Sequence, residues 1–388
     1  MFKAAFQFTS LGLLLLSVLC NTPLHAQSFK VLYAFHGGMD GAAPQADLIR
    51  GGNGTLYGTT SGGGKSSKGT VFQLDAKGNE KILYSFPGFV YGGYPFGKLV
   101  RDKAGSLYGT TLSGGGQFGD KYGTAFQLKS NGKIRNLIVF SGLNGISPGA
   151  GLIEDSAGNF YGTTSEGGPT ADGTVFLFSR FGHQKVLYGF GAPPDGGLPY
   201  SPLFRDDTGN LYGTTLGGGS GGFGTVFAVD RFGKENILYS FLGGTAGEHP
   251  NAGLIRDQQG VFYGTTVGTT GVYPPFYYGT IFKLDPSGTE TLLYSFTGGT
   301  DGGFPYGGLV QDKAGNLYGT TYAGGSFNHG TVFMLDPKGN LTTLHHFTGG
   351  MDGSSPYAGL LLQGGQLYGT AASGGAFTSG TVFRITLH

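Results

Sequence analysis

The chain has 388 residues, a formal net charge of +1, and only 12% charged residues. It carries no basic stripe to attract phosphates, so nucleic acid is not an expected partner. Glycine and proline, 80 and 17 residues, make up a quarter of the chain, but 14% aromatic residues supply enough apolar surface for a folded core.

The N-terminus has the pattern of a secretion signal. Lys3 precedes an apolar run of about ten residues that ends at Cys20, and the small Ala26 follows at a suitable cleavage distance. We therefore predict a signal peptide over residues 1–26 and a secreted protein, extracellular or periplasmic. The run is too short to span a bilayer, and no other membrane anchor is expected. A lipid anchor on Cys20 is the alternative, which the bulky Leu19 before it disfavours.

The mature chain opens with Phe29-Lys30-Val31-Leu32-Tyr33-Ala34-Phe35, a strand-like segment that recurs further along. Three strings then repeat in fixed order about every fifty residues. Tyr-Gly-Thr begins at Tyr57, Tyr108, Tyr161, Tyr212, Tyr263, Tyr318 and Tyr368. Gly-Thr-(Val/Ala/Ile)-Phe begins at Gly69, Gly123, Gly173, Gly224, Gly279, Gly330 and Gly380. Strings like Leu-Tyr-Ser-Phe begin at Leu32, Leu83, Leu137, Leu187, Leu238, Leu293 and Leu344.

One repeat predicts four antiparallel strands. In the unit that starts at Gly308, strands are expected at 309–312, 317–321, 331–335 and 341–347, separated by glycine-rich turns and loops. Four strands in about fifty residues are typical of a propeller blade. We therefore predict an all-β fold, a seven-bladed β-propeller over residues 27–388.

The ends of the chain predict how the ring closes. The opening segment 29–35 has the sequence of a fourth strand without the other three. The final segment 381–384 has the sequence of a third strand without a fourth. The first should pair with the last and complete the seventh blade, so that no long edge stays open.

Several polar residues are better explained by a structural role in the repeat than by a catalytic or ligand-binding role. The tyrosines of Tyr-Gly-Thr are expected to have a packing role, and the glycine to let a neighbouring blade approach closely. Aspartates that precede tight turns are expected to accept the backbone N–H groups of those turns; they are Asp102, Asp155, Asp206, Asp257 and Asp312.

No motif predicts a catalytic residue, a metal ligand or a cofactor. The pattern G-x-S-x-G occurs around Ser147 and Ser220, but neither copy is followed by the helix that a nucleophile elbow requires. The histidines lack metal-ligand spacing, although a ring could still bring distant ones together at its axis.

The loops that differ between repeats suggest a binding face. In four repeats the residue after the loop proline is aromatic, and these positions should surround the mouth of the central channel: Phe96, Tyr200, Tyr306 and Tyr357. Another loop is rich in aromatic residues and adds Tyr273, Phe276 and Tyr277. Such rings suit stacking against sugars or anchoring a protein partner. The alternative is that they only cover blade edges.

The spaced strings Leu-Tyr-Gly-Thr-Thr, Gly-Thr-Val-Phe-x-Leu-Asp and Leu-Tyr-Ser-Phe-x-Gly-Gly resemble the repeat of the choice-of-anchor tandem repeat GloVer-containing proteins. The resemblance covers nearly all of residues 28–387 and implies a bacterial exported protein, often with a C-terminal surface anchor. This chain shows no such tail, and the resemblance implies no established activity.

These observations lead to two main hypotheses. The first is a secreted, monomeric binding or scaffold protein that recognises an extracellular glycan or protein on its long-loop face. The alternative is a lyase or hydrolase that acts on a carbohydrate or cyclic ester at the channel mouth. An enzyme should place a histidine or carboxyl group with a strongly shifted pKa at that mouth, whereas a binding protein needs only aromatic and neutral polar groups. A structural spacer without a specific ligand is a third possibility.

Overall fold

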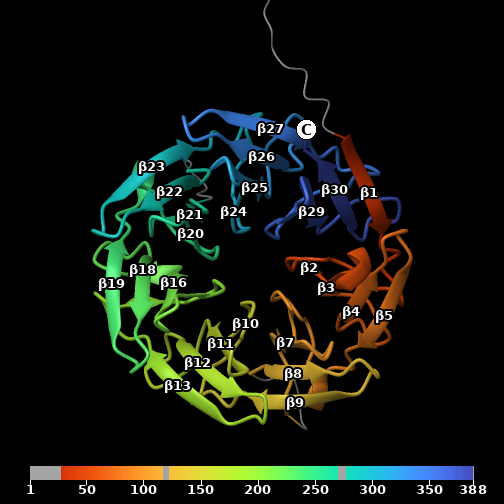
Figure 1. Cartoon of the computed structure of the whole chain (residues 1–388), viewed down its shortest axis with the longest axis horizontal. Helices are drawn as coiled ribbons and strands as arrows, with labels where there is room; N and C mark the ends of the chain where they lie inside the picture. Colours follow the sequence, from red (N-terminus) through yellow and green to blue (C-terminus); the bar gives the residue numbers. More distant parts are fainter. Residues whose placement is uncertain (1–27, 117–121, 270–276, 388) are drawn as a thin grey trace, which may run out of the picture.

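The computed structural model describes residues 28–116, 122–269 and 277–387. These residues form seven four-stranded antiparallel sheets arranged as blades around a central axis (Figure 1). The fold is the predicted seven-bladed β-propeller. The predicted signal peptide lies outside the described residues. No helix in the described part of the chain is long and apolar enough to cross a membrane.

Each blade has the same strand order from the axis outward. The innermost strands are short: β2 (Ile49–Arg50), β6 (Val100–Arg101), β10 (Ile153–Glu154), β15 (Phe204–Arg205), β20 (Ile255–Arg256), β24 (Val310–Gln311) and β28 (Leu361–Gln363). The second strands contain Tyr-Gly-Thr: β3 (Leu56–Thr60), β7 (Leu107–Thr111), β11 (Asn159–Thr164), β16 (Leu211–Thr215), β21 (Phe262–Thr266), β25 (Leu317–Thr321) and β29 (Gln366–Ala371).

The third strands contain Thr-(Val/Ala/Ile)-Phe: β4 (Thr70–Leu74), β8 (Thr124–Leu128), β12 (Thr174–Ser179), β18 (Thr225–Val229), β22 (Thr280–Leu284), β26 (Thr331–Leu335) and β30 (Thr381–Thr386). The outer strands are β5 (Glu80–Ser85), β9 (Ile134–Val139), β13 (Gln184–Gly189), β19 (Glu235–Ser240), β23 (Glu290–Ser295), β27 (Leu341–His346) and β1 (Ser28–Ala34). The loops add a short pair, β14 (Gly196–Gly197) with β17 (Gly217–Gly218), and three 3-10 turns, η1 (Gly52–Gly54), η2 (Phe89–Tyr91) and η3 (Gly244–Ala246).

The seventh blade combines strands from both ends of the described chain. Strand β1 pairs antiparallel with β30, from Ser28 opposite Thr386 to Ala34 opposite Thr381. In Figure 1 the red β1 therefore lies beside the blue β30. The ring of Phe29 in β1 stacks on His345 of the neighbouring blade, with 3.7 Å between the ring centroids.

The hydrophobic core lies in the seven interfaces between blades. At each interface a phenylalanine that follows an outer strand meets the phenylalanine of the next blade's third strand edge to face. The centroid distances lie between 5.0 and 5.3 Å for Phe35–Phe72, Phe86–Phe126, Phe140–Phe176, Phe190–Phe227, Phe241–Phe282, Phe296–Phe333 and Phe347–Phe383. The repeated Gly-Thr-Val-Phe string is therefore an interface element.

The glycine of Tyr-Gly-Thr has a different role from the expected one. A Cβ on Gly213 would lie 2.7 Å from the ring of Phe227 and 3.0 Å from Leu203, and both residues belong to the same blade. The glycine thus makes room for its own blade's phenylalanine, which then packs against the neighbouring blade. The glycine does permit close packing, as expected, but the group that approaches it belongs to the same blade and not to a neighbouring one.

The two faces of the ring differ as the sequence predicts. The loop before each blade contacts the second-to-third strand loop of that blade, as in the bridges Ala42–Gly62, Gly303–Ala323 and Ser354–Ser373. These long loops share one face, and the tight turns lie on the other. On the turn side, Asp312 accepts N–H groups from Ala314 and Asn316 and a hydroxyl from Tyr318.

Candidate binding site in the central channel

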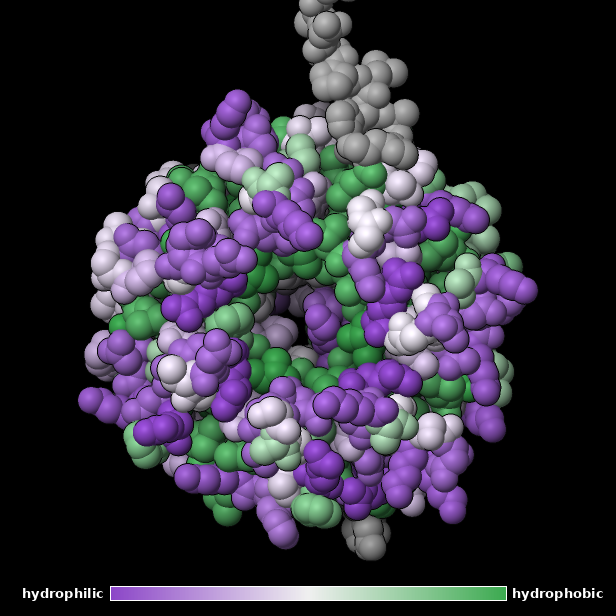
Figure 2. Space-filling view, in the orientation of Figure 1, coloured by the Kyte–Doolittle hydropathy of each residue, from purple (hydrophilic) through white to green (hydrophobic). Residues whose placement is uncertain are grey.

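The segments that lead into the first strands line the central channel. A cavity of about 450 Å³ lies there, lined by residues from all seven blades. In five of the seven segments, the first, third and fifth residues after the loop proline are more exposed than the second and fourth, as in Phe96, Lys98 and Val100 compared with Gly97 and Leu99. In the other two, Gly149, Gly151 and Gly359 are buried. The exposed first and third positions line the cavity and face the channel. Figure 2 shows hydrophobic residues gathered around the central opening, with hydrophilic residues covering most of the surrounding face.

We call the first of these odd positions the mouth ring. It lies at the long-loop end of the channel and consists of Gln45, Phe96, Gly149, Tyr200, Asn251, Tyr306 and Tyr357. The structure therefore brings together all four aromatic residues that the sequence predicted at the mouth. All four residues line the channel cavity.

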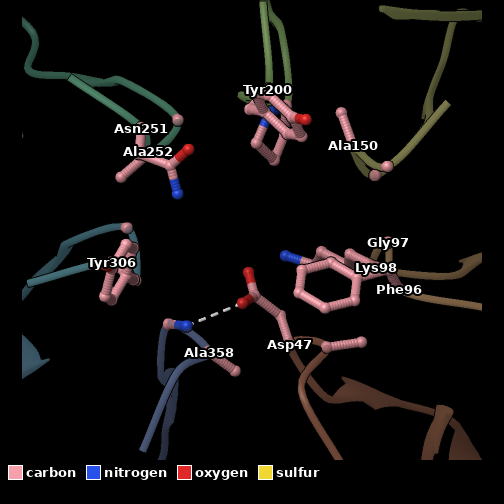
Figure 3. A pocket seen from close by; sticks show the side chains of 18 of the residues that line it. Asp47, Phe96, Gly97, Lys98, Ala150, Tyr200, Asn251, Ala252, Tyr306 and Ala358 are labelled. Atoms are coloured by element: carbon pink, nitrogen blue, oxygen red, sulfur yellow. Dashed lines mark hydrogen bonds between the residues drawn. The ribbon is translucent and has the colours of Figure 1, made fainter. Parts of the chain in front are cut away.

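Three of the four aromatic rings of the mouth are in contact. Tyr306 and Tyr357 stack with centroids 4.6 Å apart, and Phe96 meets Tyr357 edge to face at 5.2 Å. Tyr200 is 37% exposed, so part of its ring faces solvent. Figure 3 shows Phe96, Tyr200 and Tyr306 projecting around one opening. The result is a continuous aromatic surface built by repeats that are far apart in the sequence.

The hydroxyls of Tyr306 and Tyr357 are protonated at neutral pH. Burial raises the pKa of Tyr357 to about 12, and a hydrogen bond with Asn251 acts in the opposite direction. Burial also raises the pKa of Tyr306, with a smaller contribution from Tyr322. These hydroxyls can therefore donate as well as accept hydrogen bonds.

The third positions form a second level, which we call the waist ring: Asp47, Lys98, Gly151, Pro202, Gly253, Gly308 and Gly359. Only two of them carry a polar side chain, and both reach toward the channel axis (Figure 3). Asp47 Oδ1 accepts the backbone N–H of Gly359 at 2.7 Å. The fifth positions below include Val100, Ile153, Ile255 and Val310, which make the end of the cavity apolar.

Adjacent blades are joined beside the channel by buried threonines. Thr320 in β25 donates its hydroxyl to the carbonyl of Ala358 in the next blade at 2.8 Å. The equivalent bonds are Thr110 to Ala150, Thr163 to Ser201 and Thr214 to Ala252. Thr265 donates instead to the carbonyl of the loop proline, Pro305. The equivalent hydroxyls of Thr59 and Thr370 have no hydrogen-bond partner among the described residues. Thr59 lies in β3 of the blade that carries Asp47, and Thr370 lies in β29 of the blade before it.

The remaining predicted site residues do not join the mouth. Tyr277 lies beside the loop of η3, where a Cβ on Gly244 would be 3.4 Å from its hydroxyl oxygen. It is not among the residues that line the channel cavity. Tyr273 and Phe276 lie outside the described residues, so their predicted role remains a prediction.

Three residues near the channel were not identified from the sequence. Tyr322 follows Tyr-Gly-Thr-Thr and meets Tyr306 edge to face at 5.6 Å. It could have been found by comparing the residue after that string in every repeat, since the others there are smaller. Asp47 and Lys98 are visible in the same way, because the other five repeats have glycine or proline at that position.

The most strongly shifted carboxyl groups lie away from the channel. Burial, followed by the nearby charge of Asp40, raises the pKa of Glu80 to about 7. Burial and then Asp195 have the same effect on Glu235. Both glutamates begin outer strands, β5 and β19, at the periphery of the ring (Figure 1). No group of three or more potential metal ligands occurs among the described residues.

The fold and the channel define a β-propeller with an aromatic, solvent-accessible central cavity. The family model of the Gloeobacter/Verrucomicrobia repeat matches three overlapping stretches, residues 18–227, 92–271 and 203–388. The chain belongs to this repeat family, as its sequence strings indicated. No curated protein has a sequence that matches this chain significantly.

Solved structures share the fold at low sequence identity. The extracellular domain of a putative hybrid two-component system from B. thetaiotaomicron has a TM-score of 0.59 at 11% identity, over 92% of this chain and 39% of that one. A putative 6-phosphogluconolactonase from Bacteroides uniformis has a TM-score of 0.53 at 16% identity, over 82% and 88%. Puromycin hydrolase has a TM-score of 0.53 at 15% identity, over 86% and 50%. This chain thus spans well under half of the first of these proteins.

Proposed function

We propose that the mature chain is a secreted binding protein that holds an extracellular glycan at the mouth of its central channel. The observation that carries this proposal is the aromatic surface of Phe96, Tyr306 and Tyr357, which lines an accessible cavity of about 450 Å³. Aromatic faces pack against the C–H faces of sugar rings, and tyrosine hydroxyls add hydrogen bonds to sugar hydroxyls. The predicted signal peptide supports secretion, as does the fold that the chain shares with an extracellular domain.

The alternative, a lyase or hydrolase at the same mouth, has less support. It requires a general acid or base whose pKa is tuned by its surroundings in the channel. The carboxyl groups with a pKa of about 7, Glu80 and Glu235, begin outer strands instead. The neutral tyrosines of the mouth fit binding better than proton transfer.

A glycan array probed with the mature protein tests the proposal. We expect binding to one glycan class and a loss of affinity of about 1–3 kcal/mol for Tyr306→Ala or Tyr357→Ala, because buried aromatic anchors dominate interface energies. Phe232→Ala is the matched control, since Phe232 is 76% exposed in a tight turn on the opposite face. Thermal melting must show that all variants are folded. An array without signal, combined with a pull-down that captures a specific protein at the mouth, would favour a protein ligand instead.

A further inference from the structure

The waist ring contains an unusual pair of opposite charges. Asp47 and Lys98 occupy the same repeat position on adjacent blades, and both side chains reach toward the channel axis (Figure 3). They do not form a salt bridge with each other within the described structure. Asp47 Oδ2 and Lys98 Nζ have no hydrogen-bond partner among the described residues, whereas Asp47 Oδ1 is held by Gly359. One acceptor and one donor thus remain available inside the cavity.

The neighbouring glycines leave room for these two side chains. A Cβ on Gly359 would lie 3.0 Å from the carbonyl oxygen of Gly308 and 3.2 Å from Asp47 Oδ1, and a Cβ on Gly151 would lie 2.8 Å from Lys98 Cβ. Neither glycine has a positive φ, so space rather than backbone conformation explains the absence of a side chain there. The waist therefore accommodates the two charged groups on one side and leaves the rest of its circumference free of polar side chains.

The chemistry of the pair favours a neutral ligand with adjacent hydroxyl groups. A hydroxyl donates one hydrogen bond and accepts others, so neighbouring hydroxyls can donate to Asp47 and accept from Lys98 at the same time. The two charges cancel, so an acidic sugar gains from Lys98 roughly what it loses to Asp47. A neutral vicinal diol uses both groups without this conflict.

The depth of the waist determines how such a ligand enters. The waist residues follow the mouth residues by two positions along the segment that leads into the first strand, so they lie further inside the channel. A sugar linked on both sides and lying across the mouth cannot also reach this depth in a channel enclosed by seven blades. A terminal sugar can enter end-on, with its chain leaving past the aromatic mouth.

We propose that Asp47 and Lys98 bind the vicinal diol of a neutral terminal sugar, so that the protein recognises the end of a glycan chain. This inference rests on the proposed glycan-binding function and assigns its specificity. The tyrosines of the mouth would then hold the second sugar, and the apolar residues Val100, Ile153, Ile255 and Val310 would face the far side of the terminal ring.

The test uses isothermal titration of the mature protein with neutral oligosaccharides of two to six units, chosen by the array, and with tetragalacturonate as an acidic probe. We expect the affinity to stop rising after two or three units and to disappear after mild periodate oxidation, which cleaves vicinal diols. Tetragalacturonate should bind more weakly than the neutral sugars. Asp47→Asn, which can still accept the N–H of Gly359, and Lys98→Met should each weaken binding by about 10- to 100-fold, as expected for hydrogen bonds to charged groups. Lys77→Met is the control, because Lys77 is exposed in a tight turn.

The outcomes separate this inference from the proposed function. Glycan binding that keeps rising with chain length, survives periodate oxidation or is unchanged in Asp47→Asn and Lys98→Met would overturn end-on recognition and leave glycan binding intact. Tightest binding to tetragalacturonate would overturn the neutral diol. Absence of binding to every glycan would overturn the proposed function and this inference with it.

Discussion

At the scale of single residues, equivalent positions in different repeats allow the contribution of one hydrogen bond to the free energy of unfolding to be measured. Thr320 and Thr59 occupy the same position, and each is 1% exposed. The hydroxyl of Thr320 donates to Ala358 of the next blade, whereas that of Thr59 has no partner within the described structure. The difference between the two sites is therefore close to the contribution of the bond between blades.

We expect Thr320→Val to lower the free energy of unfolding by about 1 kcal/mol, because it removes the bond and leaves the Ala358 carbonyl unpaired. Thr59→Val should be neutral or stabilising, since it removes a buried hydroxyl that gains nothing from folding. Urea unfolding of both variants measures the difference. Equal destabilisation by the two substitutions would show that the bond between blades contributes nothing.

Glu80 and Glu235 predict a dependence of stability on pH. Burial raises the pKa of both carboxyl groups to about 7 in the folded chain, from about 4.5 in the unfolded chain. The folded state therefore binds these protons more tightly, and the two groups should lower the free energy of unfolding as pH rises from about 4.5 through 7. Burial lowers the pKa of His345, which acts in the opposite direction near neutral pH.

The contribution of the glutamates is best measured as a difference between proteins. We expect the Glu80→Gln, Glu235→Gln double variant to gain stability relative to the wild type as pH rises from 5 to 8. Urea unfolding at four pH values in this range tests the expectation. A constant difference across the range would mean that the two carboxyl groups titrate alike in the folded and unfolded chains.

At the scale of elements, the pairing of β1 with β30 is the contact that joins the two ends of the described chain. We expect deletion of residues 28–34 to lower the free energy of unfolding by about 3 kcal/mol or more. The deletion exposes the edge of β30 and removes several partly buried side chains, each contributing up to about 1.5–3 kcal/mol. A synthetic peptide of residues 28–36 should restore part of the loss. If thermal melting shows the truncated protein to be as stable as the intact one, this strand does not hold the ring closed.

The strands could be predicted from the sequence because each is bounded by glycine-rich turns and carries a string that recurs in every repeat. The observed β27, Leu341–His346, differs by one residue from the predicted 341–347. The mouth could be predicted as well, because a ring turns one repeat position into one circle of residues. The waist was not predicted because the sequence does not show which side chains of the segments before the first strands face the channel. In addition, Asp47 and Lys98 are the only charged residues at a position where the other five repeats have glycine or proline. Tyr322 was missed because its contacts join two different loops.

At the scale of the whole molecule, the ring converts distance in sequence into proximity in space. Phe96 and Tyr357 are 261 positions apart, yet their rings are in contact across the channel mouth. A flat or open stack of the same repeats would spread the mouth residues along a line. The ring arrangement is therefore what gives the seven repeats a common site, and the proposed binding function depends on it.

Hydroxyl-radical footprinting of the mature protein, with and without a glycan selected on the array, tests this account most directly. We predict simultaneous protection of Phe96, Tyr200, Tyr306 and Tyr357, which lie on four different blades, and no protection of the exposed Phe181 and Phe232 in the tight turns. Protection restricted to one blade, or to the tight-turn face, would contradict a common site at the channel mouth.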